Sequence, residues 1–408
     1  MNVLFVCHRL PFPPKRGGKI RPFNIIRHLH EQGHQVTVAS LARSAEELRE
    51  GQGLADHCTR TMIETVSSTA AWARMLLRLP TRVPSSMGYF YSPRLAARIR
   101  AAEREQKFDL VIVHCSSVAG YVADLRGPAK LFDLGDIDSQ KWLIYSRRRR
   151  FPLAAGYWLE GVKLEREEQR LARQFDLCTC TTRAELQTFD DFDTGVDSGW
   201  FPNGVDTDYF SPGSGEYDSN LVCFVGRMDY FPNQEAMFRF CREVWPDVRR
   251  ARPEARLRIV GASPSPGVQK LAELPGVEVT GSVDDVRPHV REAALTVAPL
   301  SIARGTQNKI LESMAMGVPV LASAEAAPGV DAVPDEHLLV ADDPAQYRDG
   351  ILRLLSDGAE RQRFADAGRA RVVSNHDWRA SMRKLDGLVE RCIENRRRRG
   401  PVSNGDPV

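Results

Sequence analysis

Two cations stand at the beginning of a predicted helix in the second half of the sequence. The stretch ARGTQNKILESMAMGVPVLAS, residues 303–323, predicts a helix over 306–316, because its apolar residues recur at helical spacing. Gly317 ends this pattern, and a short buried strand follows it. Arg304 and Lys309 lie where the unpaired amides and the dipole of the helix already make the potential positive. A bound anion would make this arrangement favourable.

A further basic residue could reach the same anion. Arg227 follows the apolar run LVCFVG, at the end of a predicted strand, and arginine suits phosphate recognition. If Arg227, Lys309 and the first amides of the helix converge, they form a site for a diphosphate. Glu312, three residues after Lys309, could then accept hydrogen bonds from two vicinal hydroxyls of a ribose. Phosphates together with a ribose indicate a nucleotide.

Simpler structural explanations exist for each of these residues. A surface ion pair explains a single residue such as Arg227 equally well. Lys309 and Glu312 have the spacing of a salt bridge along one helix, although lysine before glutamate is the less favourable order. The nucleotide site therefore depends on whether these residues converge in the fold.

The first half of the sequence also carries polar residues after strand-like runs. His114 follows DLVIV, and Gly17 and Gly18 precede a helix, where glycine lets backbone amides approach a phosphate or a sugar. Asp136 and Asp138 follow AKLFDL in the run GDIDS. A lone histidine is more often a loop residue and two glycines are more often an ordinary loop, so neither identifies a function by itself.

Short β-rich runs alternate with amphipathic stretches along the chain, the pattern of parallel sheets with crossover helices. The predicted strands are NVLFVC, QVTVAS, DLVIVH, AKLFDL and DLCTCTT in the first half, and LVCFVG, ARLRIVG, GVEVTG, ALTVAPL and VPVLAS in the second. A segment rich in Gly, Pro, Ser and Asp separates the two series near residues 203–218. We therefore expect an α/β protein of two doubly wound domains, whose ligands bind beyond the carboxyl ends of the strands.

The same pattern sets the expected domain boundaries. An N-terminal domain is predicted at residues 1–205 and a C-terminal domain at 206–375. A last amphipathic helix is predicted at about 376–395, and the basic and polar residues 396–408 are predicted to form a disordered tail.

The composition of the sequence limits the classes of protein to which it can belong. With 408 residues, 42% of them hydrophobic and 27% charged, the chain can form two large cores. Its net charge of +3 is small for this length and, without a zinc-finger or RNA-binding signature, argues against a nucleic-acid binder. Its eight cysteines form no CxxC pair, which indicates reduced thiols in a cytosol. The sequence carries neither a signal peptide nor an apolar run of roughly 18 residues, so we expect a cytoplasmic protein.

These motifs together resemble a known family. FPNGVD, FVGRMDYFPN and GTQNKILESMAMGVPVLAS, with the early GG loop, are similar to family-4 retaining glycosyltransferases of the GT-B fold. More narrowly, they resemble the sugar transferases associated with PEP-CTERM/exosortase exopolysaccharide clusters. The resemblance implies two Rossmann-like domains facing across a cleft, with a final helix that returns to the first domain. It also implies a hexosyltransferase-type enzyme that moves a sugar from a nucleotide-diphosphate sugar, of UDP or GDP type, to an acceptor.

The resemblance assigns roles to residues of this sequence. It implies that Arg227 contacts the diphosphate, Glu312 the ribose, Gly18 the donor near its phosphate and sugar, and His114 the transferred sugar close to the reacting carbon. The catalytic candidates are therefore His114, Arg227 and Lys309. The donor-binding candidates are Gly17, Gly18, Arg227, Arg304, Gly305, Thr306, Gln307, Asn308, Lys309 and Glu312. The acceptor-side candidates are Arg21, Asp136 and Asp138.

Two positions depart from the family pattern. The family commonly has a glutamate eight residues before the ribose-binding glutamate, where it contacts the donor sugar, but position 304 here is arginine. The usual lysine five residues after the diphosphate-binding arginine is replaced by Pro232. Lys309 is our candidate for the missing charge, because it lies at the helix start. Protein cations would then neutralise the leaving nucleotide diphosphate, so we expect no cofactor and no metal.

The expected partners are a nucleotide-sugar donor and a glycan or polyprenyl-linked acceptor. The runs AWARMLLRLPTR and YSRRRRFPLAAGYWLEGVK combine arginines with apolar residues, as segments on an anionic bilayer surface do. This favours peripheral attachment at the inner face of the cytoplasmic membrane. The alternative is that the apolar residues belong to a core and that the arginines are simply solvated.

Two other functions are compatible with the same motifs. One is a sugar-nucleotide epimerase of the same fold, which would release an epimerised sugar nucleotide without an acceptor. The other is a non-catalytic nucleotide-sugar-binding protein of a polysaccharide assembly complex, which arginine in place of glutamate at position 304 would favour. The sequence does not specify the donor sugar, the nucleobase, the acceptor, the linkage or the oligomeric state.

Overall fold

The structure is a computed structural model that describes residues 1–14 and 17–400. It divides the chain into two compact units. Unit 1 contains Met1–Phe201 and the C-terminal part of the chain from Met382, and unit 2 contains Pro202–Ser381. The change from unit 1 to unit 2 lies four residues before the boundary expected after residue 205.

Unit 1 is built on a parallel sheet. Its described strands pair in the order β3-β2-β1-β4-β5-β6-β7. The strands are β1 (Asn2–Cys7), β2 (Gln35–Ala42), β3 (Arg60–Thr65), β4 (Leu110–His114), β5 (Ala129–Gly135), β6 (Leu177–Cys180) and β7 (Ser198–Trp200). β1, β4 and β5 lie in the middle of the sheet and are almost wholly buried, because helices cover both faces of a parallel sheet.

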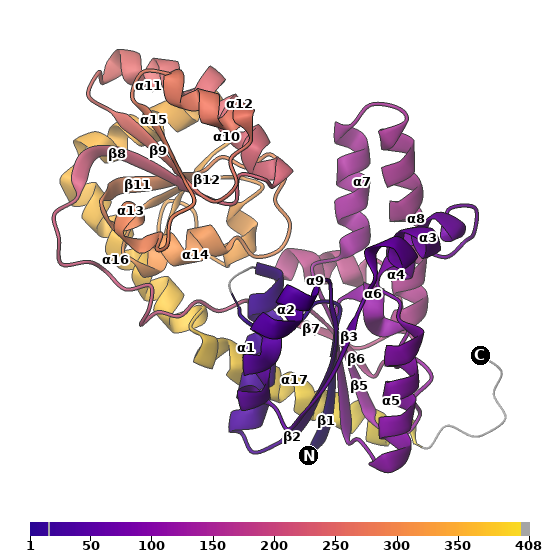
Figure 1. The fold of residues 1–408 in the computed structure, drawn as a ribbon. Coiled ribbons are helices and arrows are strands. Elements are labelled where there is room, and N and C mark those ends of the chain that lie inside the picture. The colour runs from indigo at the N-terminus through magenta and orange to yellow at the C-terminus, as the bar shows by residue number, and fades with distance from the viewer. Residues whose placement is uncertain (15–16, 401–408) are drawn as a thin grey trace. The chain divides into compact units, whose positions relative to one another are not determined.

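Helices flank both faces of this sheet (Figure 1). They are α1 (Gly17–Glu31), α2 (Ala45–Glu50), the 3-10 helix η1 (Gly51–His57), α3 (Ser68–Arg78), α4 (Ser85–Tyr89), α5 (Pro93–Glu105), α6 (Ser116–Ala119), α7 (Asp138–Arg148), α8 (Leu153–Ala172) and α9 (Arg183–Asp190). Helices α7 and α8 pair along their length and form a hairpin that projects from the unit.

Unit 2 repeats the same architecture. Its described strands pair in parallel in the order β10-β9-β8-β11-β12-β13. They are β8 (Asp218–Val225), β9 (Arg256–Val260), β10 (Val277–Gly281), β11 (Ala293–Ala298), β12 (Val320–Ser323) and β13 (Leu339–Ala341). The helices are α10 (Phe231–Glu243), α11 (Trp245–Ala251), α12 (Pro266–Gln269), η2 (Lys270–Glu273), α13 (Arg287–Arg291), α14 (Asn308–Ala315), η3 (Ala327–Val330), α15 (Pro344–Ser356) and α16 (Gly358–Asn375).

The last helix, α17 (Trp378–Arg399), begins in unit 2 and continues into unit 1. Its C-terminal part binds unit 1 through Asn395, which donates to the carbonyl of Asp176, and through Arg399, which donates to the carbonyl of Phe175 at 2.8 Å. The disordered tail expected from residue 396 is therefore wrong for 396–399, because their arginines favour the C-terminal end of a helix and find carbonyl partners. Residues 401–408 lie outside the described residues.

All ten predicted strands are confirmed, with ends that differ by up to three residues. The prediction missed β3, β7 and β13, which lie at sheet edges. None of the helices in the described ranges is both long and apolar enough to cross a lipid bilayer.

The strand orders identify where ligands should bind. In each sheet the chain reverses its direction of progress at one point, between β1 and β4 in unit 1 and between β8 and β11 in unit 2. Open parallel sheets bind ligands beyond the carboxyl ends of the strands at such switch points. His114 ends β4, and Arg227 follows β8, so both predicted residues lie at these points.

Candidate functional site

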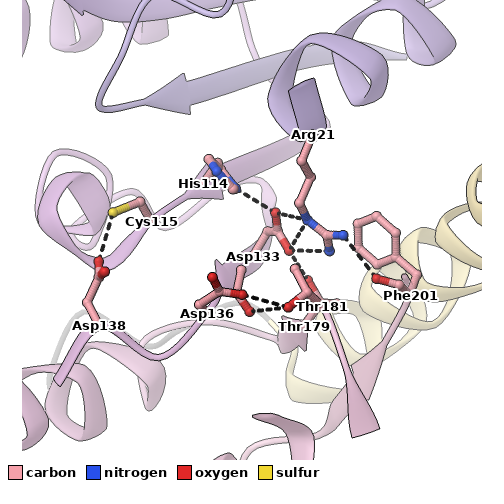
Figure 2. Close-up of polar contacts among 10 residues, drawn as sticks. Arg21, His114, Cys115, Asp133, Asp136, Asp138, Thr179, Thr181 and Phe201 are labelled. Carbon is pink, nitrogen blue, oxygen red and sulfur yellow. Dashed lines mark hydrogen bonds and ion pairs between the residues drawn. The ribbon is translucent and has the colours of Figure 1, made fainter. Parts of the chain in front are cut away.

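A buried aspartate lies at the centre of a polar network in unit 1. Asp133, on β5, has no exposed surface. Its carboxylate accepts hydrogen bonds from Arg21 Nε at 2.9 Å and Nη2 at 2.7 Å, from His114 Nδ1 at 2.7 Å and from Thr179 Oγ1 at 2.9 Å. Figure 2 shows these side chains meeting at Asp133. Burial alone would raise the pKa of Asp133, but the Arg21 guanidinium and His114 hold it well below its ordinary value.

Arg21 belongs to this network and not to an acceptor surface. Only 2% of the residue is exposed, and its Nη1 donates to the carbonyl of Phe201 at 2.9 Å. The guanidinium also lies 3.6 Å from the centre of the Phe201 ring. The expected acceptor-side role of Arg21 is therefore corrected. Arg21 lies on the buried side of α1, so its guanidinium reaches Asp133. A carboxylate inside the unit needs such a cation because an unpaired buried charge is unfavourable.

His114 ends β4 with its ring held in one orientation. Its Nδ1 bonds Asp133, so Nε2 is the ring nitrogen left for a ligand. Gly135, with φ of +70°, lets the backbone of β5 pass close to the ring, because a Cβ there would lie 3.3 Å from His114 Cε1. The ring of His8, the residue after β1, lies 6.3 Å from that of His114. Burial lowers the pKa of His8 well below its ordinary value, and nearby cations add to this effect.

The two aspartates of GDIDS have separate partners. Asp136 accepts a hydrogen bond from Thr181 Oγ1 at 2.8 Å. Asp138, at the start of α7, accepts from Cys115 Sγ at 3.2 Å (Figure 2). It also accepts weakly from Ser116 Oγ at 3.4 Å. Within residues 1–14 and 17–400, the structure contains no group of three or more His, Cys, Asp or Glu side chains that could hold a metal ion.

The two glycines of the early loop begin α1 rather than precede it. Gly17 and Gly18 are exposed, and a Cβ at Gly18 would meet no atom within 4 Å. No packing contact within the described chain therefore explains the glycine at position 18. Both residues carry backbone amides of the first helical turn, which have no partner inside the helix.

The second site lies at the end of β8 in unit 2. Gly226 follows this strand, and a Cβ there would lie 2.7 Å from Asn233 Nδ2 and 3.1 Å from Lys309 Nζ. Asn233, near the start of α10, donates to the carbonyl of Arg227 at 2.8 Å and accepts from Lys309 Nζ at 2.6 Å. The structure therefore brings Lys309 to the backbone of Arg227, with Asn233 between them.

The environment of Lys309 is unusual for a lysine. Its ammonium lies 4.6 Å from the centre of the Phe224 ring, in addition to its bond with Asn233. Burial lowers the pKa of Lys309 to about 7, and the Glu312 carboxylate acts in the opposite direction. Burial likewise raises the pKa of Glu312 to about 7, with Lys309 opposing it. Lys309 thus donates to Asn233, and its charge and that of Glu312 also act on one another.

Arg227 also lies at the end of β8, but its side chain is more exposed than that of Lys309. Its Nε donates to Asp229 at 3.0 Å, and its Nη2 contacts the same carboxylate. The hydrogen bonds to Asp229 raise the pKa of Arg227 above its ordinary value. The surface ion pair considered from the sequence is thus present.

The loop before α14 differs from its prediction. The helix begins at Asn308, two residues later than expected, so Thr306 and Gln307 belong to the loop. Gln307 Nε2 donates to the carbonyl of Arg304 at 3.1 Å and does not cap the helix. Gly305 has φ of +64° and its carbonyl lies against Gly329, where a side chain would not fit. In this loop, the buried atoms Thr306 Oγ1 and Asn308 Oδ1 have no hydrogen-bond partner among the described residues.

Sequence reasoning missed three residues of these sites: His8, Asp133 and Asn233. Asp133 had a signal, since an acidic residue inside the apolar run AKLFDLG must find a cation when the strand is buried. His8 directly follows the first strand and could have been named by the same rule as His114. Asn233 gives no such signal, because its role depends on the position of Lys309, 76 residues later.

Comparison with known proteins agrees with this architecture. The model described as Glycosyltransferase Family 4 matches residues 16–209, and the model described as Glycosyl transferases group 1 matches residues 219–357. No curated protein is similar enough in sequence to be matched.

Several solved structures have the same fold. Sucrose-phosphate synthase from Thermosynechococcus elongatus is 16% identical, with 97% of this chain and 100% of that chain covered and a TM-score of 0.71. HepE from Anabaena in complex with UDP is 14% identical, with 96% and 100% covered and a TM-score of 0.69. TarM is 12% identical, with 95% and 99% covered and a TM-score of 0.71. The two family models, with one match in each half of the chain, support a family-4-like glycosyltransferase, and the similar solved structures show that the chain has the GT-B fold.

Proposed function

We propose that this protein transfers a sugar from a nucleotide-diphosphate sugar, of UDP or GDP type, to a glycan or lipid-linked acceptor with retention of configuration. The acceptor would belong to exopolysaccharide or cell-surface glycan biosynthesis, as the resemblance to PEP-CTERM-associated transferases implies. The titles of similar structures support a nucleotide-sugar donor. HepE is described in complexes with UDP and UDP-glucose, and TarM from S. aureus in a complex with UDP and alpha-GlcNAc-glycerol.

One observation carries this proposal. At the switch point of unit 2, the partly buried ammonium of Lys309 lies beside Gly226, and the two residues Thr306 and Asn308, just before Lys309 at the start of α14, each carry a buried polar atom that has no hydrogen-bond partner among the described residues. Buried polar atoms normally have hydrogen-bond partners, and a helix start favours an anion. The side chains of Lys309, Thr306 and Asn308 fit the phosphates and the adjoining hydroxyls of a nucleotide-sugar. Glu312, six residues after Thr306 and inside α14, is our candidate for the ribose.

The proposed chemistry is electrostatic. As the bond between the anomeric carbon and the diphosphate breaks, negative charge grows on the leaving phosphate. Lys309, Arg227 and the amides at the start of α14 would stabilise this charge without a metal. The acceptor hydroxyl would attack on the face from which the nucleotide leaves, which retains the configuration at the anomeric carbon.

In unit 1, we propose that His114 Nε2 bonds a hydroxyl of the transferred sugar, and that the amides of Gly17 and Gly18 approach the donor. Asp133 would act as a positioning residue for His114, because it fixes the orientation of the ring and leaves Nε2 for the sugar. Asp136 is exposed and Asp138 partly so, and both stay candidates for the acceptor side.

We also propose a peripheral position at the inner face of the cytoplasmic membrane, where a polyprenyl-linked acceptor would be reached. The basic and apolar segments noted in the sequence support this proposal, since they include exposed apolar side chains in unit 1.

Ligand-induced stabilisation tests the donor. A panel of UDP- and GDP-sugars should include at least one that raises the melting temperature of the purified protein, because a ligand of the native state adds to its stability. The shift and the transfer should both persist with a chelator, since protein cations are proposed to neutralise the diphosphate. Absence of any shift across the panel contradicts donor binding. Loss of transfer on chelation with rescue by Mg²⁺ or Mn²⁺ contradicts metal independence.

Arg304 should act on the diphosphate rather than on the sugar. It precedes α14 in the same loop as Thr306, and a guanidinium can only donate hydrogen bonds, unlike the glutamate common in the family. Arg304→Gln is therefore expected to weaken binding of the nucleoside diphosphate alone and of several full donors by a similar factor, measured by calorimetry. Unchanged affinity for the sugar-free diphosphate, with lost discrimination among sugars, would instead make Arg304 the residue that selects the sugar.

A further inference from the structure

Two segments of unit 1 contain arginines but no acidic residue. Residues 65–102, which include α3 and α4, and residues 139–159, which include most of α7 and the start of α8, have neither Asp nor Glu. The first segment contains Arg74, Arg78 and Arg82 in and just after α3. The second contains four successive arginines at 147–150, all exposed, at the turn between α7 and α8. Positive charge is therefore concentrated on these elements.

The structure places the two segments beside one another. Lys163, on α8, donates to the carbonyl of Leu79 at the end of α3 at 2.7 Å. Glu160, one turn earlier on α8, accepts hydrogen bonds from the backbone amides of Ser85 at 2.9 Å and Ser86 at 2.8 Å. The end of α3 and the start of α4 are thus fixed against the middle of α8, as Figure 1 shows. Glu160, the first acidic residue after the second segment, is held by these amides.

Large apolar side chains are exposed on the same elements. On α3, only Ala71 is buried, while 74% of Leu77 is exposed, together with Trp72 and Leu76. At the tip of the α7–α8 hairpin, 85% of Phe151 is exposed. The exposed apolar residues of these two elements are Trp72, Leu76, Leu77, Leu79, Phe151, Leu153, Trp158 and Leu159. A set of this size on two elements that pack against one another indicates a surface that another body covers.

We infer that α3 and the tip of the α7–α8 hairpin form one surface that binds an anionic lipid bilayer. Charge decides among the possible occupants, because segments that contain arginines and no acidic residue of their own suit anionic headgroups and repel a second identical copy. Tryptophan, leucine and phenylalanine beside arginine also match an element that lies at the headgroup boundary with its apolar side chains inserted. This inference rests on the peripheral membrane position of the proposed function and adds the residues that would contact the bilayer.

The hairpin also connects this surface to the site of unit 1. Helix α7 begins at Asp138, which accepts a hydrogen bond from Cys115, the residue after His114. It ends at Arg148, so the arginine run lies roughly 15 Å further along the helix axis, at 1.5 Å per residue. A bilayer at the tip would therefore lie within reach of a lipid whose headgroup occupies the site. This part of the inference rests on the proposed transfer to a lipid-linked acceptor.

Binding to vesicles tests the surface in the absence of a donor. The full-length protein should co-sediment with phosphatidylglycerol-containing vesicles much more than with phosphatidylcholine vesicles. Replacing the four arginines at 147–150 by glutamine should weaken this binding at least about tenfold, since each basic residue near an anionic surface contributes to it. A second variant, with Leu76, Leu77 and Phe151 changed to serine, should weaken binding to a similar extent while its charge is unchanged.

A matched control uses arginines of α5, which follows α3 and α4 in the chain. Arg94, Arg100 and Arg104 are exposed on α5, and the first two belong to the acid-free segment, but no large apolar side chain is exposed on this helix, so replacing these three by glutamine should affect vesicle binding much less. Equal binding to both vesicle types, or an equal loss in the α5 control, overturns the inference. A dimer in sedimentation velocity that the serine variant dissociates, without vesicle binding, would show that a second copy covers the surface. Transfer to a soluble acceptor is measured separately, so failure of vesicle binding leaves the proposed transfer standing.

Discussion

Replacing Lys309 by methionine is expected to lower sugar transfer by roughly 100- to 1,000-fold, the range found when a preorganised charge-stabilising group is removed. Methionine keeps an unbranched apolar side chain beside Phe224, so the fold should be retained. Arg227→Ala is expected to weaken transfer as well, because this guanidinium lies at the same strand end. Initial rates with saturating donor and thermal unfolding of each variant provide the measurement.

The matched control is Arg242→Ala in the same unit. Arg242 lies on α10 and forms an exposed ion pair with Glu243, as Arg227 does with Asp229, but it is remote in sequence from α14 and the end of β8. The Arg242→Ala substitution should leave the rate of sugar transfer unchanged. Undiminished transfer in both Lys309→Met and Arg227→Ala would remove the diphosphate site from the proposal.

The pKa of Lys309 gives this prediction a pH dependence. Burial lowers the pKa to about 7, so the side chain is charged below this pH and becomes neutral above it. A diphosphate binds the charged form, and the affinity of the wild-type protein should therefore fall as pH rises through neutrality. Lys309→Arg should weaken this dependence, because arginine stays protonated, while Glu312, whose pKa burial raises to about 7, still titrates in the same range. Calorimetric titration with the nucleoside diphosphate between pH 6 and 9 measures the difference.

Replacing Asp133 by alanine is expected to destabilise unit 1 by about 3–5 kcal/mol, the usual cost of removing one partner from a buried ion pair. The substitution leaves the Arg21 guanidinium buried without its carboxylate and removes the acceptor for His114 Nδ1. The unfolding transition of unit 1 should move to lower denaturant concentration. Asp136→Ala is the matched control, since Asp136 is exposed and makes a hydrogen bond with Thr181, and it should cost about 1 kcal/mol or less.

The substitution Asp133→Asn tests whether Asp133 orients the His114 ring for transfer or only stabilises the fold of unit 1. Asparagine has the same shape, but its amide group cannot replace both oxygen acceptors. Transfer should fall sharply, as in His114→Ala, while affinity for the nucleoside diphosphate stays unchanged, because Lys309 and its partners lie in unit 2. If Asp133→Asn transfers sugar normally while His114→Ala does not, then Asp133 serves the fold alone.

The strands show how far local pattern determines this fold. Central strands such as β1 and β4 are buried on both faces, so they form continuous apolar runs that the sequence reveals directly. β7 and β13 have three residues each, and in β3, at the edge of its sheet, only Met62 is buried. Edge strands need fewer apolar residues because one side has no neighbour, and their sequences therefore resemble loops.

The candidate sites likewise contain some residues that the local sequence reveals and others that depend on the fold. The sequence singled out Lys309 and the start of α14, because a cation at a helix start conflicts with the local potential whatever the fold. It singled out His114 from its place after a strand, and the roles of both residues stay predictions. It assigned Arg21 to the acceptor side and missed Asp133, although a buried ion pair joins the two side chains. Their partnership spans 112 residues and depends on the order of the strands.

The sequence by itself determined the two series of strands, the junction between them and the residues that follow strand ends, since periodicity and chain order are local properties. Only the tertiary structure decided which charges meet. Strand order brings His114, Arg21 and Thr179 to one carboxylate, and the packing of α10 beside α14 brings Asn233 to Lys309. Each of these buried polar groups must have a partner, but the sequence does not say which one, because several candidates satisfy the same requirement and only their positions in space select among them.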